Sequence, residues 1–298
     1  MKKAVANNGS NILAYATAFF VVAIWGTTFV QTKVLINAGL RPEEIFLYRF
    51  VLAYLLILPF AGKRLFLDSL RDEVAALLLG VTGGSLYFVT ENTALIYGYC
   101  SNVSLLVCTT PLITAIVMGI LFPKEKMKKG ALTGSLVAFM GMALVIFNGN
   151  FVLKLSPLAD TLAFAACICW TLYSVIMKYI QPRYGTMLIM RKVFGYGVLT
   201  IVPFFIGTPP RVELLTQGGT VVWLNILTLG CVASMLCYTL WNFVLKRLGT
   251  VRATNFIYFN PVVTIVTSWL VLDEKITWIA ILGAALVLAG MYCMEQKK

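Results

Sequence analysis

Two oppositely charged residues inside long apolar runs are the first candidates for chemistry. Arg49 lies about six residues after the start of a run near 43–61, and Glu91 about six residues before the end of a run near 73–97. If these runs cross a membrane in opposite directions, both residues lie roughly 9 Å from the same surface. Three interpretations are open: a structural ion pair, a cavity-facing pair that binds substrate or exchanges a proton, and lone side chains that snorkel to the surface.

A second basic group lies near the inner end of the run near 186–206. It consists of Arg191 and Lys192. Lys192 can snorkel to anionic headgroups, because its long apolar stem reaches the membrane surface. Arg191 is kept as a candidate for substrate binding, since a charge within a membrane span needs a polar partner or a water-filled cavity.

Aromatic and amide side chains within the apolar runs form the next group of candidates. Rings of Trp and Tyr offer flat apolar area with a polar handle, but they also populate membrane interfaces. A buried amide must face protein or water, so contact between helices and contact with substrate are both open. The aromatic candidates are Trp25, Tyr87, Trp170, Tyr173, Tyr238, Trp241 and Tyr258, and the amides are Asn92, Asn102, Asn242, Asn255 and Asn260.

Other kinds of site find little support in the sequence. The chain has no His, the commonest general base, and its 7 Cys show no CxxC spacing for zinc. The odd number of Cys argues against a disulfide framework. No Gly-rich phosphate loop is present. We therefore expect no catalytic residue, no metal and no cofactor.

The elements that must position these residues are transmembrane helices. Of the 298 residues, 60% are hydrophobic and 12% charged, against roughly 45–50% and about 25% in soluble domains. Apolar runs long enough for a helix of roughly 20 residues recur along the whole chain. They lie near 12–36, 43–61, 73–97, 100–122, 130–148, 157–180, 186–206, 219–245, 249–272 and 276–294. The sequence predicts an all-α protein of ten transmembrane helices in a lipid bilayer.

The basic residues indicate the orientation of these helices. With the N-terminus inside, 16 of the 24 Lys and Arg lie in inner segments, 5 in outer segments and 3 within spans. Short loops rich in Lys and Arg stay in the cytoplasm. We therefore expect a multi-pass protein of the cytoplasmic (inner) membrane with both termini cytoplasmic. The net charge of +12 is a topology signal, not a sign of nucleic-acid binding.

The chain contains an internal repeat. Arg49 corresponds to Arg191 at an offset of 142 residues, and Trp25 corresponds to Trp170 at an offset of 145. Glu91-Asn92-Thr93 corresponds to Trp241-Asn242-Phe243 at an offset of 150. Pro111 answers Pro261 at 150, Glu125-Lys126 answers Glu274-Lys275 at 149, and Gly134 with Gly141 answers Gly283 with Gly290. Because each half holds five spans, an odd number, the halves must have opposite orientations. The sequence predicts inverted five-helix repeats at 1–150 and 151–298, the plan of secondary transporters.

Two kinds of small or rigid residue have a place in this plan. Pro111 and Pro261 interrupt equivalent helices, and paired interruptions are a pointer to a transport site. Gly130, Gly134, Ala138 and Gly141 give the fifth span a small-residue face, which Gly283 and Gly290 repeat on the tenth. Such faces pack helices closely, either within one chain or across a homodimer through the fifth and tenth helices.

These features resemble a known family. The early Trp25-Gly26, Ala94-Leu95 before a short turn, Pro111, the Glu125-Lys126 turn and the two following glycines, repeated in the second half, are similar to a pair of EamA-type domains of the drug/metabolite transporter superfamily. The second half departs from the pattern at Trp170-Thr171, which lacks the Gly after Trp. The resemblance implies a ten-helix fold with a central cavity lined by the third, fourth, eighth and ninth helices plus the first and sixth. It also implies transport of amino acids, nucleosides, sugars or other metabolites, often outward.

The function expected from the sequence is secondary transport of a small organic metabolite, an amino acid or related solute, by alternating access. The alternative is a proton-coupled exporter of drugs or other cations that uses Glu91. A membrane enzyme acting on lipid is a remote alternative, because it would want clustered Asp, Glu, Ser and His near one interface. A channel would be expected to show rings of like charge or a filter sequence.

The predicted topology can be tested by labelling. Single cysteines at Lys124 and Arg211, in a background without native cysteines, should react with an impermeant thiol reagent from the inside and from the outside, respectively. If both positions react from the same side, the inverted repeat is wrong.

Overall fold

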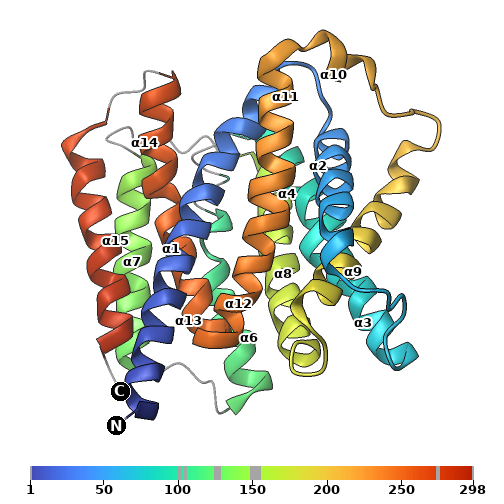
Figure 1. The fold of residues 1–298 in the computed structure, drawn as a ribbon. Helices are drawn as coiled ribbons and strands as arrows, with labels where there is room; N and C mark the ends of the chain where they lie inside the picture. The colour runs from blue at the N-terminus through green and yellow to red at the C-terminus, as the bar shows by residue number, and fades with distance from the viewer. Residues whose placement is uncertain are drawn as a thin grey trace. The chain divides into compact units, whose positions relative to one another are not determined.

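A computed structural model describes residues 2–98, 103, 106–123, 129–147, 156–272 and 276–296, and every regular element in them is helical (Figure 1). The first half contains α1 (Lys2–Asn37), α2 (Pro42–Ile57), α3 (Leu70–Gly80), α4 (Leu86–Tyr97), α6 (Thr110–Leu121) and α7 (Lys129–Phe147). The second half contains α8 (Pro157–Ile180), α9 (Thr186–Ile201), α10 (Glu213–Gln217), α11 (Gly219–Leu227), α12 (Cys237–Leu248), α13 (Thr250–Asn255), α14 (Asn260–Leu272) and α15 (Trp278–Gln296). Short 3₁₀ turns are η1 (Leu58–Phe60), η4 (Val202–Phe205) and η6 (Phe256–Phe259).

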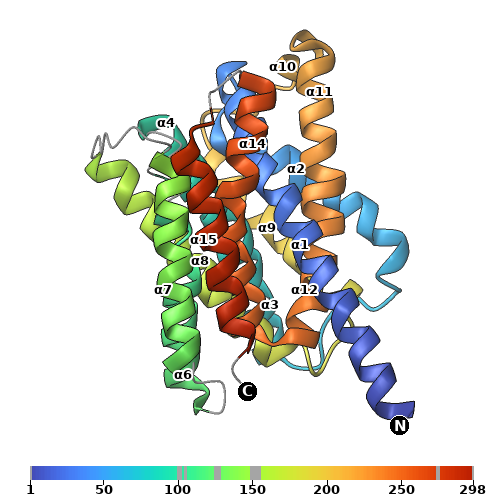
Figure 2. The same cartoon turned by 90° about the vertical axis from the view of Figure 1, so that its left-hand side faces the viewer.

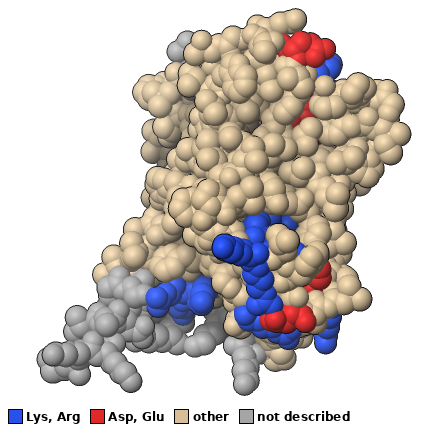
Figure 3. All heavy atoms as spheres, turned by 45° about the vertical axis from the view of Figure 1, so that its right-hand side comes forward, with Lys and Arg blue, Asp and Glu red and all other residues tan. Residues whose placement is uncertain are grey.

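The helices follow the ten predicted apolar runs, apart from the short α10. Within the described residues, five helical stretches are long and apolar enough to cross a membrane, and they are Ile12–Asn37, Leu70–Tyr97, Pro157–Ile180, Thr186–Phe205 and Gly219–Leu248. Large apolar side chains point outward, such as Ile120 at 71% exposed and Ile281 at 63%. On the face drawn in Figure 3, charged side chains lie in two groups with a wide uncharged zone between them. This is the distribution expected for helices in hydrocarbon.

Two of the long helices are interrupted by π-helical segments that the sequence did not predict. η2 (Val81–Ser85) joins α3 to α4, and η5 (Thr228–Leu236) joins α11 to α12. The offset of 150 that relates Glu91 to Trp241 carries η2 onto 231–235, which lies within η5. In η2 the backbone of Gly84 leaves the helical region, with φ −131° and ψ −109°. The irregularity is therefore part of the repeat.

The predicted proline interruptions are also present. Pro111 is the second residue of α6 and follows a turn at 108–109, and Pro261 is the second residue of α14 and follows η6. Proline is tolerated in a first helical turn because the N–H groups there have no partner within the helix. Each proline thus begins a helix at repeat-related positions.

The chain folds into two compact units that do not coincide with the two sequence repeats. One unit comprises Met1–Thr27, Tyr99–Leu155 and Leu240–Lys298, and the second unit comprises Thr28–Gly98 and Ser156–Thr239. Each unit therefore draws helices from both halves of the sequence.

In the first unit, α7 packs against α15 through their glycine faces (Figure 2). A Cβ atom on Gly141 would lie 2.6 Å from the carbonyl oxygen of Gly283, and one on Gly290 would lie 2.5 Å from the backbone nitrogen of Ala138. The small residues thus let two backbones of one chain meet, as expected for small-residue helix packing. Because this contact uses the glycine faces, they no longer argue for a homodimer, which stays a prediction.

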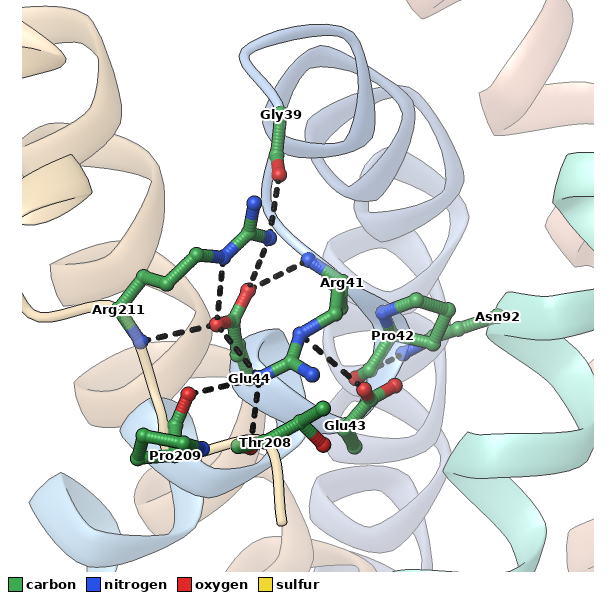
Figure 4. A network of polar contacts seen from close by, with 9 residues as sticks. All are labelled: Gly39, Arg41, Pro42, Glu43, Glu44, Asn92, Thr208, Pro209 and Arg211. Atoms are coloured by element: carbon green, nitrogen blue, oxygen red, sulfur yellow. Dashed lines mark hydrogen bonds and ion pairs between the residues drawn. The ribbon is translucent and has the colours of Figure 1, made fainter. Parts of the chain in front are cut away.

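In the second unit, a buried carboxylate holds the start of α2. Glu44 is fully buried, and its oxygens accept bonds of 2.7–3.0 Å from the backbone and guanidinium groups of Arg41 and Arg211 (Figure 4). Arg211 also donates to the carbonyl of Gly39 at 2.7 Å, and Arg41 donates to the carbonyls of residues 208–209. The bond to Glu44 raises the pKa of the Arg211 guanidinium. This cluster ties the turn before α2 to the loop before α10.

A second polar cluster holds the start of α3 in the same unit. Asp72 accepts hydrogen bonds from Arg183 at 2.7 Å and from the hydroxyl of Tyr184 at 2.8 Å, and both donors lie in the turn before α9. Glu73 next to it pairs with Lys192 of α9. Lys192, which could have extended to lipid headgroups, therefore pairs with an acidic side chain of the protein instead. In the repeat, the turn before α9 answers the turn before α2, so each half supplies one such turn.

The glycine contact of the first unit makes a prediction about stability. Gly283→Ala should lower the free energy of unfolding by about 1–3 kcal/mol, because its new Cβ would press on the backbone of α7. Thermal unfolding of the purified protein in detergent measures this. Gly185→Ala is the matched control, since a Cβ there meets nothing within 4 Å. Equal stability of the two variants would contradict the close packing.

The cluster at α2 makes a separate prediction. Glu44→Gln should destabilise the protein by about 2 kcal/mol, because two guanidinium groups lose their shared counter-charge. Glu43→Gln is the control on the same helical turn, since Glu43 makes a single ion pair of 3.3 Å with Arg41. The same unfolding measurement applies, and a larger loss for Glu43→Gln than for Glu44→Gln would show that the cluster does not hold the helix.

Candidate functional site

Arg49 is the charged residue at the centre of the second unit. It lies on α2 and is 2% exposed. Its Nε donates a hydrogen bond of 2.8 Å to the hydroxyl of Ser234 in η5, and its guanidinium carbon lies 4.2 Å from the centre of the Phe88 ring. Its two terminal nitrogens have no hydrogen-bond partner among the described residues. A buried cation is therefore held by neutral groups alone.

Glu91 on α4 is the corresponding anion. It is 8% exposed, and its Oε1 accepts a hydrogen bond of 2.9 Å from the hydroxyl of Tyr87, one helical turn earlier. Its second oxygen has no partner in the described part of the chain. There, no ion pair within 4.0 Å joins Glu91 to Arg49, although the two are close enough for their charges to interact. The direct pair suggested by their matched depth is thus not formed.

Aromatic rings pack next to the two charges. The ring of Trp170 on α8 lies 5.2 Å from that of Tyr87, 5.1 Å from that of Tyr173 and 5.9 Å from that of Tyr238. The hydroxyl of Tyr238 donates to the backbone carbonyl of Gly83 in η2 at 2.7 Å. The hydroxyl of Tyr173 is buried and has no partner among the described residues. Five of the predicted site residues that carry a charge or a ring therefore form one cluster with Arg49.

This cluster can do one kind of chemistry readily. It combines a guanidinium with free donors, a carboxylate with a free acceptor, and packed aromatic rings. Groups of these types are suited to a small molecule that carries an anionic group, a cationic group and an apolar part.

Two further predicted residues lie in the same unit but have structural partners. Asn92 is 2% exposed and reaches the carbonyl of Pro42 at 3.5 Å, a long contact. Arg191 donates to the carbonyl of Gly62 at 3.0 Å, while its Nη2 has no partner among the described residues. Arg191 therefore ties α9 to the loop after η1.

The remaining predicted residues belong to the first unit. The rings of Trp25 and Trp241 lie 5.1 Å apart, and the hydroxyl groups of Tyr258 and Ser135 are 2.6 Å apart. Three more are Asn242, which is fully buried, and Asn255 and Asn260, whose side-chain oxygens have no partner in the described structure. Asn102 lies outside the described residues. Tyr258 thus serves to join η6 to α7.

Sequence reasoning missed three residues of the cluster. Ser234 and Gly83 are small residues in apolar runs, and neither type stands out there. Phe88 looked like any lipid-facing or core aromatic. Only the repeat offered a signal, because the offset of 150 relates the two interrupted segments that carry Gly83 and Ser234.

The chain is similar in sequence to several known transporters. The chain is 26% identical to a probable amino-acid metabolite efflux pump of Escherichia coli (strain K12), over 92% of each chain. It is 30% identical to an uncharacterized transporter of Bacillus subtilis (strain 168), over 89% of this chain and 88% of the relative. It is 23% identical to a probable terminal-alkyne amino-acid exporter of Streptantibioticus cattleyicolor, over 76% of this chain and 74% of the relative.

A solved structure and a family model also match this chain. A solved crystal structure superposes with a TM-score of 0.76 at 16% identity, covering 95% of this chain and 97% of the other, which shows a shared fold. A family model described as the EamA-like transporter family matches residues 12–147 and 157–295. This confirms the predicted duplication and a multi-pass membrane transporter that is not an enzyme. The chain therefore belongs to the EamA-like transporter family.

Proposed function

We propose that this transporter exports amino acids, or metabolites that keep an amino group and a carboxylate, by alternating access. The observation that carries the proposal is the pair of buried charges in the second unit. Arg49 and Glu91 have opposite signs, and each is held only by neutral partners. A zwitterion supplies the missing counter-charge to both.

The physical argument rests on the cost of isolated charges. Removing an ion from water costs several kcal/mol even in a relaxed protein, and opposite charge with good hydrogen bonds offsets this. A ligand carboxylate can take the free nitrogens of Arg49, and a ligand ammonium can take the free oxygen of Glu91. The substrate thus gives Arg49 and Glu91 each an oppositely charged partner.

The rings of the cluster favour an apolar or flat substrate side chain. The rings of Tyr87, Trp170 and Tyr173 pack in series in this cluster, and Tyr87 contacts Glu91 directly. Contacts of aromatic rings with apolar groups bury large areas, and the Tyr hydroxyls can orient a polar tip. The names of two relatives, a probable amino-acid metabolite efflux pump and a probable terminal-alkyne amino-acid exporter, support the same class of substrate.

Orientation and assembly complete the proposal. The excess of basic residues in one set of loops supports cytoplasmic termini in the inner membrane. The repeats at 1–150 and 151–298 would then have opposite orientations, as in many transporters that work by alternating access. A homodimer stays a prediction from the sequence.

A second candidate function is proton-coupled export of organic cations. The free oxygen of Glu91 favours it, since a carboxylate without an ion pair can exchange a proton or bind an ammonium group. This mechanism needs Glu91 but gives the terminal nitrogens of Arg49 no role.

The two candidates predict different effects of substitution. For amino-acid export, Glu91→Gln and Arg49→Lys should each reduce uptake of labelled L-phenylalanine into proteoliposomes by at least about tenfold, because each removes one recognition contact. Lysine keeps the charge but cannot hold a carboxylate with two parallel bonds. Glu213→Gln, an exposed carboxylate in α10, is the control and should leave uptake unchanged.

A comparison with 2-phenylethylamine, which lacks the carboxylate, separates the candidates. Transport of this amine that depends on Glu91 and not on Arg49, together with no transport of L-phenylalanine or other common L-amino acids by the unmodified protein, would replace the proposal by cation export.

A further inference from the structure

The interrupted segment η5 carries Ser234, a side chain that contacts Arg49 and has no part in the proposed substrate contacts. Ser234 is fully buried, and its hydroxyl accepts the Nε–H of Arg49 at 2.8 Å. It lies in a π-helical stretch, and π-bulges within α-helices occur frequently at functional sites. The irregular backbone and the bond to the site cation therefore coincide.

This bond determines which donors of Arg49 remain available. A guanidinium has five N–H donors in a fixed planar fork. Ser234 takes the Nε donor, and the Phe88 ring lies over the guanidinium group. What remains is the end formed by Nη1 and Nη2, whose parallel N–H bonds fit the two oxygens of a carboxylate.

The repeat-related segment η2 makes an equivalent contact. The backbone carbonyl of Gly83 accepts the hydroxyl hydrogen of Tyr238, and the hydroxyl of Ser85 bonds that of Thr200 at 2.8 Å. Each π-helical segment thus holds one side chain of the cluster, a cation in one case and a ring in the other. A parallel role in both halves argues against a local accident of packing.

We propose that Ser234 is a positioning residue that aims the free end of Arg49 at the substrate and so selects a free carboxylate over an amide or an ester. The inference rests on the proposed function, and it assigns the choice of anionic group to η5. An amide has one acceptor oxygen and no charge, so it gains little from an oriented fork. A free carboxylate gains both bonds only when the fork faces it.

A purely structural role is the competing explanation. Ser234 would then only satisfy a buried N–H, and its loss would weaken all ligands alike or lower stability. The two roles separate when two ligands that differ only at the carboxyl group are compared.

The test uses the full-length protein in detergent and competition against bound labelled L-phenylalanine. The competitors are unlabelled L-phenylalanine and L-phenylalaninamide. Ser234→Ala should lower the affinity for L-phenylalanine by about tenfold and change the affinity for L-phenylalaninamide by less than about twofold. The preference for the acid over the amide therefore falls. Ser174→Ala is the control, because Ser174 is equally buried but bonds the carbonyl of Trp170 in its own helix.

Each outcome decides the inference. An equal change for acid and amide, or no change for either, overturns it while leaving amino-acid export standing. Failure of the unmodified protein to bind any common L-amino acid overturns the proposed function instead. If Ser234→Ala does not fold, Ser234→Cys keeps the shape of the side chain with a weak acceptor and should show the same loss of acid preference.

Discussion

A charge buried among apolar helices needs a partner, and the second unit of this protein meets that constraint in two different ways. At the starts of α2 and α3 the charges are paired with opposite charges, Glu44 with Arg211 and Asp72 with Arg183. At Arg49 and Glu91 only neutral groups are provided. The first arrangement is complete and fixes the ends of helices. The second is incomplete, and this incompleteness is the reason why we propose the cluster as a binding site.

The duplication of the chain explains how this cluster is assembled. Neither half of the sequence holds all of its parts, because Arg49 and Glu91 come from the first half, while Ser234 and Trp170 come from the second. The compact unit that contains them draws its helices from both halves. A π-helical segment from each half then anchors one member of the cluster. A single five-helix repeat would lack either the charges or their supports.

Much of the fold could be predicted from the sequence, since apolar run length and repeated landmarks report directly on helices. Arg49 and Glu91 were predicted for the same reason, because a charge in an apolar run is conspicuous. A direct ion pair between them, one of the interpretations left open by the sequence, is not formed, because matched depth fixes position along two helices but not the direction in which each side chain points. The burial of Glu44 was missed because a residue at the end of an apolar run can face water or protein equally well. Ser234 was missed because the turn of a π-helix, not its residue type, brings it to Arg49.

The incomplete charges also suggest how binding and movement are linked. A ligand shifts a conformational equilibrium only by the difference in its affinity for the two states. Arg49 lies on α2 and Glu91 on α4, so a zwitterion that reaches both must connect two helices, and it binds best where their separation matches its length. An uncharged ligand, or one with a single charge, connects nothing and has little differential affinity to contribute. Separating the two charges, instead of pairing them, would therefore let the protein bind its substrate and let that same contact favour one state of alternating access over the other.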